Sequence, residues 1–273
     1  MKNIKKYFFN LFVSFCLFIT SSSLLIADTA QPKPQVKTGT FAWSEASDKV
    51  ILVVPENYTL GRSYPLIVAI PQEGQEPDEL AKEWESVSER MSLIVMIPRY
   101  LLRSGSAPER MDDWLLLLRS DIMKQYKIAK NKIFLIAQGS SADYAGYLGM
   151  RYPEKFSAVA LLEGSWIGAY QKMSRVQKEV RRQVPFYVAL PGANTELLQQ
   201  TESLAQQLQA AGYMVHIRKM TDKEKATQPE FKKLVYEWLN EHSDTWQDHV
   251  DQSKKTWKQK LKNAIRENFI IES

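Results

Sequence analysis

The stretch Lys132–Arg151, KIFLIAQGSSADYAGYLGMR, determines the fold that the sequence predicts. Apolar residues run over 133–137, and several small residues follow before a segment with small residues at helical spacing. A short apolar run that ends in Gly and Ser before a helix is typical of a buried strand that leads into a sharp turn. We therefore predict a strand, a tight turn at Gly139 and a helix.

Strands and helices alternate on both sides of this stretch. Apolar or β-rich runs predict strands at 38–44, 49–54, 64–70, 93–97, 157–162, 185–190 and 213–219. Amphipathic spacing predicts helices at 78–91, 111–126, 141–151, 196–211 and 229–241, with a short helix within 170–182. The buried face of helix 196–211 is expected to comprise Leu197, Thr201, Leu204, Leu208 and Ala211. This alternation implies parallel strands with right-handed crossovers, and hence a three-layer α/β/α sandwich with a mostly parallel sheet.

The first 27 residues have the pattern of a secretory signal peptide. A basic start precedes an apolar run over 7–26, and Ala27 is expected to be the last residue removed. This predicts a secreted or periplasmic protein; an uncleaved leader, which would associate with the membrane, is the alternative. The rest divides into an N-terminal tether and first strand (28–47), an α/β domain (48–242) and an amphipathic helical tail (243–273).

The charge of the chain gives no reason to expect a nucleic-acid partner. Of its 36 basic residues, Lys2, Lys5 and Lys6 lie in the leader, whereas all 31 acidic residues follow it. Without the leader, the formal net charge therefore falls from +5 to +2. Binding to a polyanion requires a strongly basic surface, so we predict no nucleic acid among the partners.

The tail combines lysines with an apolar stripe. This stripe comprises Trp246, Val250, Trp257, Leu261 and Ile265. It is interpreted either as a face that packs back on the domain or as a docking helix for a partner or a membrane surface.

Several short motifs occur in the order and spacing of one protein family. They are YPLIVAI at 64–70, DDW at 112–114, the strand and turn at 133–141, RYPEKFSAVA at 151–160, AGYMV at 211–215 and YEWL at 236–239. In these motifs the chain resembles α/β-hydrolases of the secreted esterase and polyhydroxybutyrate-depolymerase type. The resemblance covers residues 49–241 and implies an α/β-hydrolase fold.

The resemblance also indicates where catalytic groups would stand. The family's nucleophile elbow, Gly-x-Ser-x-Gly, corresponds here to residues 137–141, AQGSS, with Gly139 in place of the serine. The carboxylate position holds Asn194, and Lys225 is nearest to the histidine position. The His-Gly pair that shapes the oxyanion hole is replaced by Pro71-Gln72. These mismatches predict a degenerate triad, with Gly139 in the positive-φ conformation that an elbow requires.

Two serines beside Gly139 are alternative nucleophiles. Ser141 becomes the central residue if the elbow is read two residues later, which puts Asp143 at a position that favours a small residue. Ser140 is the other candidate. Serine side chains also suit the N-cap, so both are expected to help start the following helix.

A serine nucleophile needs a base, and the three histidines do not stand at the expected turn. His216 lies within a predicted strand, His242 ends the last helix of the domain, and His249 lies in the tail. Their spacing does not suit a metal site, and no phosphate-binding or dinucleotide-binding motif occurs. The single cysteine, Cys16, lies in the leader. We therefore predict no metal and no cofactor.

Two sets of residues near the elbow have structural interpretations as well as functional ones. Trp166, Tyr170 and Tyr144 flank the place where a hydrolase binds substrate, and they either line a pocket or belong to the core. Gly146 and Gly149 are expected to permit close packing of a helix.

The sequence thus favours an exported pseudo-hydrolase without a working Ser-His-Asp triad, which binds or scaffolds an unidentified protein or small molecule. The alternative is a secreted serine carboxylesterase or acyl hydrolase that uses Ser141 or Ser140 in an atypical site.

Overall fold

The computed structural model describes residues 36–43, 50–99, 108–168 and 183–243. The strands are β1 (Gly39–Ala42), β2 (Val50–Val54), β3 (Tyr64–Ile70), β4 (Ile94–Pro98), β5 (Ile128–Gln138), β6 (Ala158–Leu162), β7 (Phe186–Pro191) and β8 (Val215–Met220). The helices are α2 (Pro77–Met91), α3 (Pro108–Gln125), the 3₁₀ turn η2 (Gly139–Ser141), α4 (Ala142–Arg151), α5 (Thr195–Ala210) and α6 (Pro229–His242). The predicted leader, the helix within 170–182 and the tail after residue 243 lie outside the described residues.

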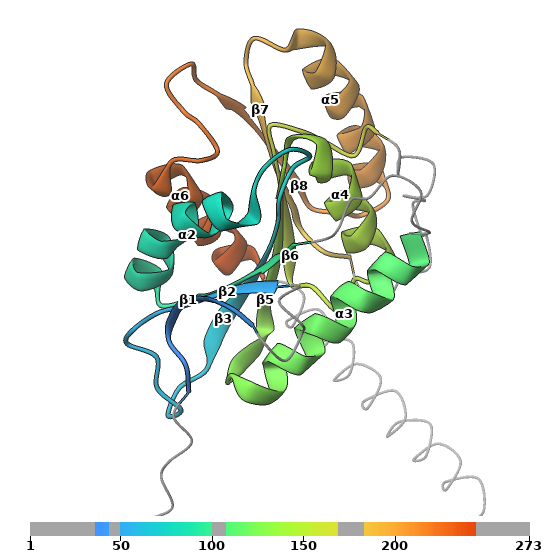
Figure 1. The fold of residues 1–273 in the computed structure, drawn as a ribbon. Helices are drawn as coiled ribbons and strands as arrows, with labels where there is room; N and C mark the ends of the chain where they lie inside the picture. Colours follow the sequence, from blue (N-terminus) through green and yellow to red (C-terminus); the bar gives the residue numbers. More distant parts are fainter. Residues whose placement is uncertain (1–35, 44–49, 100–107, 169–182, 244–273) are drawn as a thin grey trace, which may run out of the picture. The chain divides into compact units, whose positions relative to one another are not determined.

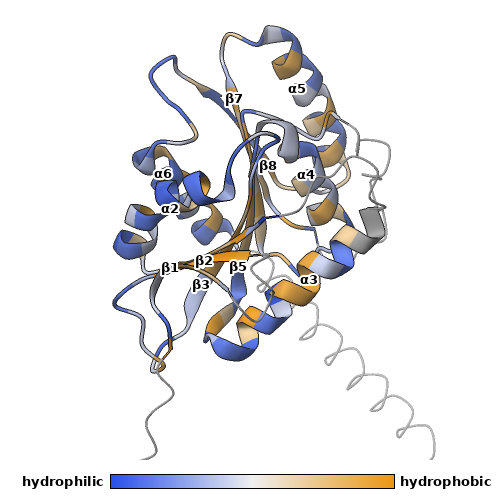
Figure 2. Cartoon of the chain, in the orientation of Figure 1, coloured by the Kyte–Doolittle hydropathy of each residue, from blue (hydrophilic) through white to orange (hydrophobic). Residues whose placement is uncertain are grey.

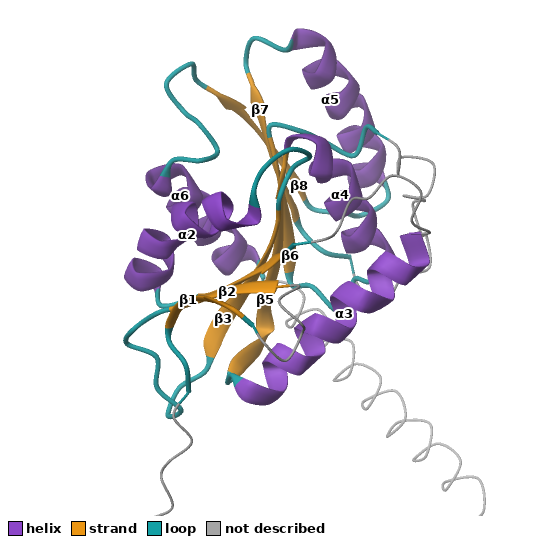
Figure 3. Cartoon of the chain, in the orientation of Figure 1, coloured by secondary structure: helices purple, strands orange, loops and turns teal. Residues whose placement is uncertain are grey.

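All of these strands belong to one sheet, in the order β1-β2-β4-β3-β5-β6-β7-β8 (Figure 3). β1, β2 and β4 pair antiparallel, and every pair from β4 to β8 is parallel. Five central strands are buried along almost their whole length because their sequences are continuous apolar runs. The prediction of a mostly parallel sheet is confirmed.

Helices cover both faces of the sheet. Figure 1 shows α2 and α6 on one face and α3, α4 and α5 on the other, which confirms the predicted three-layer sandwich. The strands are mainly hydrophobic, whereas the helices carry both hydrophobic and hydrophilic residues (Figure 2). Each helix therefore buries one side against the sheet.

The α2–α6 side has a core with large aromatic groups. Trp84, Phe134 and Tyr236 are buried there, and the rings of Phe134 and Tyr236 meet edge to face with centroids 5.9 Å apart. Burying each such side chain contributes about 1.5–3 kcal/mol relative to exposure. This core fixes the two helices whose polar residues reach the loops above the sheet.

The helix that follows the elbow packs unusually close to its neighbours. A Cβ at Gly146 would collide with the indole of Trp166, and one at Gly149 would lie 2.7 Å from Cγ2 of Val159. The interpretation of these two glycines as close-packing residues is therefore confirmed, and Trp166 belongs to the core.

Two details of the predicted elements are wrong. The buried residues of α5 are Leu198, Thr201, Ala205 and Leu208, whereas Leu197 and Leu204 are only half-buried, because the helix is rotated from the expected face. β5 begins five residues earlier than expected, since polar residues at 130–132 extend the strand past the apolar run.

Candidate active site

The elbow has the geometry that the sequence predicts. β5 ends at Gln138, Gly139 has a φ of +55°, and α4 follows directly. A side chain at Gly139 would collide with Oε1 of Gln72, because this carboxamide lies over the turn. The turn and its positive φ are thus present, and the space above Gly139 is filled by Gln72.

The two candidate nucleophiles face different environments. Ser140 is exposed, and its Oγ accepts a hydrogen bond from the backbone N–H of Glu73 at 3.0 Å. Ser141 is fully buried, and its Oγ donates to the carbonyl oxygen of Pro71 at 2.6 Å. Only Ser140 can therefore reach a substrate. Ser141 occupies the N-cap position of α4 as expected, but its side chain makes no capping hydrogen bond, and both hydroxyls instead bond the loop after β3.

The other two positions of the predicted triad lie at the same edge of the sheet. Asn194 follows β7, and its Oδ1 accepts from the backbone N–H of Leu197 at 3.1 Å, which caps α5. Lys225 is exposed in the loop between β8 and α6, where its backbone N–H donates to Gln228. The carboxyl ends of parallel strands meet at one edge, so the structure brings the loops of Gly139, Asn194 and Lys225 together there.

The described histidines lie toward the opposite edge. His216 is the second residue of β8, and its ring stacks on Trp238 with centroids 5.8 Å apart. His242, at the C-terminal end of α6, also stacks on Trp238, with ring centroids 4.2 Å apart. Because α6 begins at the elbow edge and rises about 1.5 Å per residue, it carries His242 roughly 20 Å away. His249 lies outside the described residues.

A carboxylate that was not predicted from the sequence lies beside the elbow. Glu163 directly follows β6 and has a φ of +54°, a conformation that strains a residue with a side chain. Its carboxylate accepts from Nε2 of Gln138 at 2.7 Å and from the backbone N–H of Ala226 at 3.2 Å. Glu163 thus ties the end of β5 to the loop before α6. A charged residue directly after a buried strand was the signal that could have identified it.

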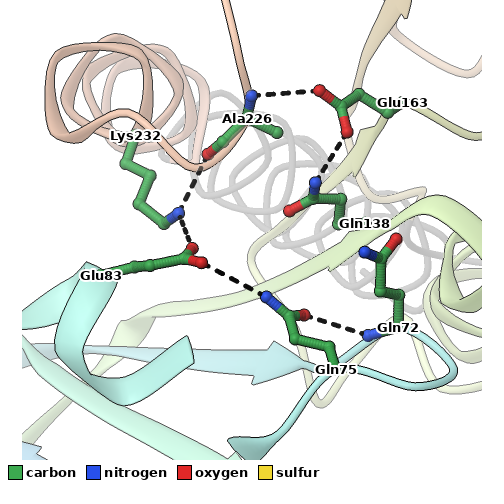
Figure 4. Close-up of polar contacts among 7 residues, drawn as sticks. All are labelled: Gln72, Gln75, Glu83, Gln138, Glu163, Ala226 and Lys232. Carbon is green, nitrogen blue, oxygen red and sulfur yellow. Dashed lines mark hydrogen bonds and ion pairs between the residues drawn. The ribbon is translucent and has the colours of Figure 1, made fainter. Parts of the chain in front are cut away.

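A buried ion pair, also missed, lies in the same network (Figure 4). Lys232 on α6 is only 2% exposed, and its Nζ donates to Glu83 at 2.6 Å and to the carbonyl oxygen of Ala226 at 3.0 Å. Burial lowers the pKa of Lys232, and the Glu83 carboxylate opposes this shift. Beside the pair is a cavity of about 10 Å³, lined mainly by apolar side chains together with Gln138. It has room for about one water molecule.

The aromatic residues near the elbow belong to the core. Tyr144 is fully buried, and its hydroxyl donates to Asp112 at 2.8 Å. Tyr170 lies outside the described residues. The pocket-lining interpretation of Tyr144 and Trp166 is therefore wrong, because close helix packing buries both.

The described part of the chain contains no group of three or more His, Cys, Asp or Glu side chains that could hold a metal ion. Within the same residues, no helix is long and apolar enough to cross a membrane.

The sequence matches no protein family profile and no curated protein, but the fold is similar to solved enzymes. The fluorophosphonate-binding serine hydrolase F of Staphylococcus aureus aligns with a TM-score of 0.55 and 10% identity over 70% of this chain and 91% of its own. Thermogutta terrifontis esterase 2, phosphorylated by paraoxon, aligns with a TM-score of 0.55 and 13% identity, over 70% of this chain and 88% of its own. A ferulic acid esterase aligns with a TM-score of 0.53 and 15% identity, over 74% of this chain and 95% of its own. The chain therefore has the α/β-hydrolase fold.

This comparison contradicts the prediction of a non-catalytic pseudo-hydrolase that binds or scaffolds a partner. The three solved structures named above are described as serine hydrolases or esterases, and this is the finding that stands against the prediction. The polyhydroxybutyrate-depolymerase-like character and the export of the chain stay predictions.

Proposed function

We propose that this protein is a serine ester hydrolase whose nucleophile is Ser140. The observation that carries the proposal is the 3.0 Å hydrogen bond from the Glu73 N–H to the exposed Ser140 Oγ at the elbow edge of the sheet. When a serine attacks an ester, the oxyanion forms on the substrate's carbonyl oxygen next to Oγ, and an N–H that bonds Oγ beforehand can turn to that oxygen and stabilise it. Ser141 does not fit this role because its hydroxyl is buried and donates to Pro71.

The proton of Ser140 needs an acceptor other than the described histidines. Our candidate is Lys225, since this exposed residue belongs to the loop after β8 at the elbow edge. Serine–lysine pairs carry out this chemistry on other folds. Ser140 would bond to the acyl carbon while its proton passes to this base, and the alcohol would leave with that proton. Water would then release the acid by the same steps.

Fluorophosphonate labelling of the purified protein tests the proposal. We expect a single adduct on the peptide that contains Ser140, together with turnover of a short-chain aryl ester. Ser140→Ala should abolish both, and Ser141→Ala, the matched control, should retain the label. An unlabelled wild-type protein, or a label that survives in Ser140→Ala, would exclude Ser140 as the nucleophile.

We further propose that the enzyme acts outside the cytoplasm, secreted or periplasmic. The basic start and the apolar run over 7–26 support this location. The protein recovered outside the cytoplasm should then begin at or near Asp28, and an intact Met1 in a membrane fraction would argue for an anchor instead.

A further inference from the structure

The orientation of one peptide group decides whether the site has its backbone donor. The carbonyl oxygen of Gln72 accepts a hydrogen bond from the backbone N–H of Gln75 at 3.1 Å. In a trans peptide the C=O and the N–H point in opposite directions. Because the Gln72 carbonyl points toward Gln75, the N–H of Glu73 in the same peptide group points away from it, to Ser140.

The side chain of Gln75 holds this turn from the other side. Its Oε1 accepts from the backbone N–H of Gln72 at 3.3 Å, so Gln75 bonds both the N–H and the C=O of that residue. Its Nε2 reaches Oε1 of Glu83 at 3.4 Å (Figure 4). The Gln75 carboxamide thus connects the loop after β3 with helix α2.

Glu83, to which Gln75 donates, is itself held in place by Lys232. Glu83 pairs with Lys232, whose Nζ also bonds the carbonyl oxygen of Ala226 and lies 5.4 Å from the centre of the Trp84 ring. A charge at this depth is retained only if its partners stay in place, because a separated buried charge is costly. The ion pair therefore supplies a fixed point against which Gln75 can hold the loop.

We propose that Gln75 is a positioning residue of this site, held by the Lys232–Glu83 pair, and that it keeps the Glu73 N–H directed at Ser140. The proposal rests on the proposed function, since it assigns a role in presenting the oxyanion donor. The side chain of Gln75 is not expected to touch the ester itself.

Gln75→Met tests the role, because methionine keeps the length of the side chain and removes both of its hydrogen bonds. We expect kcat for an aryl ester and the rate of fluorophosphonate labelling to fall about 10- to 100-fold, as for a misdirected oxyanion donor, with KM unchanged. The melting temperature should change little because Gln75 is only half-buried. The matched control is Gln209→Met, which removes a carboxamide bond to the carbonyl oxygen of Val215 beside β8.

A second variant tests whether the Lys232–Glu83 pair holds Gln75 in place. Lys232→Met combined with Glu83→Leu removes the ion pair without leaving a lone charge, and it should lower the labelling rate as Gln75→Met does. Adding Gln75→Met to this double variant should then cause no further loss.

The outcomes separate the two proposals. Labelling of the wild type at Ser140 with an unchanged rate in Gln75→Met would overturn the role of Gln75 and leave the hydrolase standing. A rise in KM at constant kcat would likewise overturn it, since that indicates a binding role. Absence of labelling in the wild type would overturn both proposals.

Discussion

Two buried charged residues, Asp112 and Lys232, lie on opposite faces of the sheet. Neutral phenol groups surround Asp112, whereas a carboxylate pairs with Lys232. Asp112, between α3 and α4, is completely buried and accepts hydrogen bonds from Tyr144, Tyr147 and Tyr152 at 2.7–3.0 Å. Lys232, on the α2–α6 face, pairs with Glu83. The first cluster joins two helices, whereas the second continues through polar side chains into the loops around Ser140.

The difference indicates which cluster serves stability alone. The three phenols donate to one carboxylate, and burial together with the bond to Asp112 raises the pKa of Tyr147. The hydrogen bonds to Asp112 join α3 to α4 and to Tyr152, whereas those of the Lys232–Glu83 pair lead to the loop after β3. Removing Asp112 should therefore cost stability without changing the chemistry of folded molecules, whereas removing Gln75 should do the reverse.

The largest effect is expected for Asp112→Ala. It removes the carboxylate to which three phenol groups donate, two of them buried; at about 1–3 kcal/mol for each buried group, the free energy of unfolding should fall by about 2–6 kcal/mol. Urea unfolding measures the loss. Asp112→Asn, which keeps acceptor capacity, should lose less. A variant as stable as the wild type would show that the three bonds contribute nothing net.

A smaller loss is expected for Lys232→Met. It leaves the Glu83 carboxylate without its cation, but Glu83 is 22% exposed and can be partly solvated. We expect a fall of about 2–4 kcal/mol, somewhat less than the about 3–5 kcal/mol of a broken pair in which both charges are fully buried. Adding Glu83→Leu should restore most of the stability but not the labelling rate. Recovery of both would mean that the pair has no role in positioning.

Gly139→Ala separates backbone strain from the displacement of Gln72. A positive φ costs an alanine about 1–3 kcal/mol, and its Cβ would also push the Gln72 carboxamide aside. Gly212→Ala is the matched control, because Gly212, between α5 and β8, has a φ of +93° and an added Cβ would likewise meet a glutamine carboxamide, 3.0 Å from Oε1 of Gln183. Both should lose stability in thermal unfolding, and only Gly139→Ala should slow the labelling of Ser140. Equal labelling rates would show that the position of Gln72 does not matter.

The sequence predicted the sheet well because the buried strands are continuous apolar runs such as Tyr64–Ile70. It also predicted the turn at Gly139, since a glycine between a strand and a helix leaves few alternatives. It could not predict which serine is exposed, because the 3₁₀ turn over 139–141 sets the direction of each side chain. Spacing alone does not fix that rotation.

The Lys232–Glu83 ion pair and the positive φ of Glu163 could not be predicted from the sequence, for a different reason. Glu83 and Lys232 are 149 residues apart, and each has the place of an ordinary charged residue on an amphipathic helix. Only the packing of α2 against α6 brings them together. Glu163 has its positive φ beside a close contact with the elbow, where an added Cβ on Gly164 would collide with the carbonyl oxygen of Gly139; this contact between distant parts of the chain leaves no mark in the sequence.

The smallest effect concerns the edge of the sheet away from the elbow. Partial desolvation by the neighbouring rings lowers the pKa of His216, although the residue stays exposed, and the interactions with His242 and Arg218 lower this pKa further. The unfolded chain, with a histidine pKa of about 6.5, therefore binds a proton that the folded chain does not bind in the window below that value. Stability contributed by the neutral ring is present above about pH 6.5 and is lost as the pH falls through the lowered pKa of the folded state. Thermal unfolding between roughly pH 5 and 7.5 should show that stability rises with pH, and His216→Gln should flatten this dependence.

The labelling rate of Ser140, corrected for the folded fraction, should not respond to His216→Gln, because the ring stacks on Trp238 and Tyr187 rather than reaching the elbow. A labelling rate that changed with His216 would place an imidazole in the chemistry and remove the distinction between the two edges.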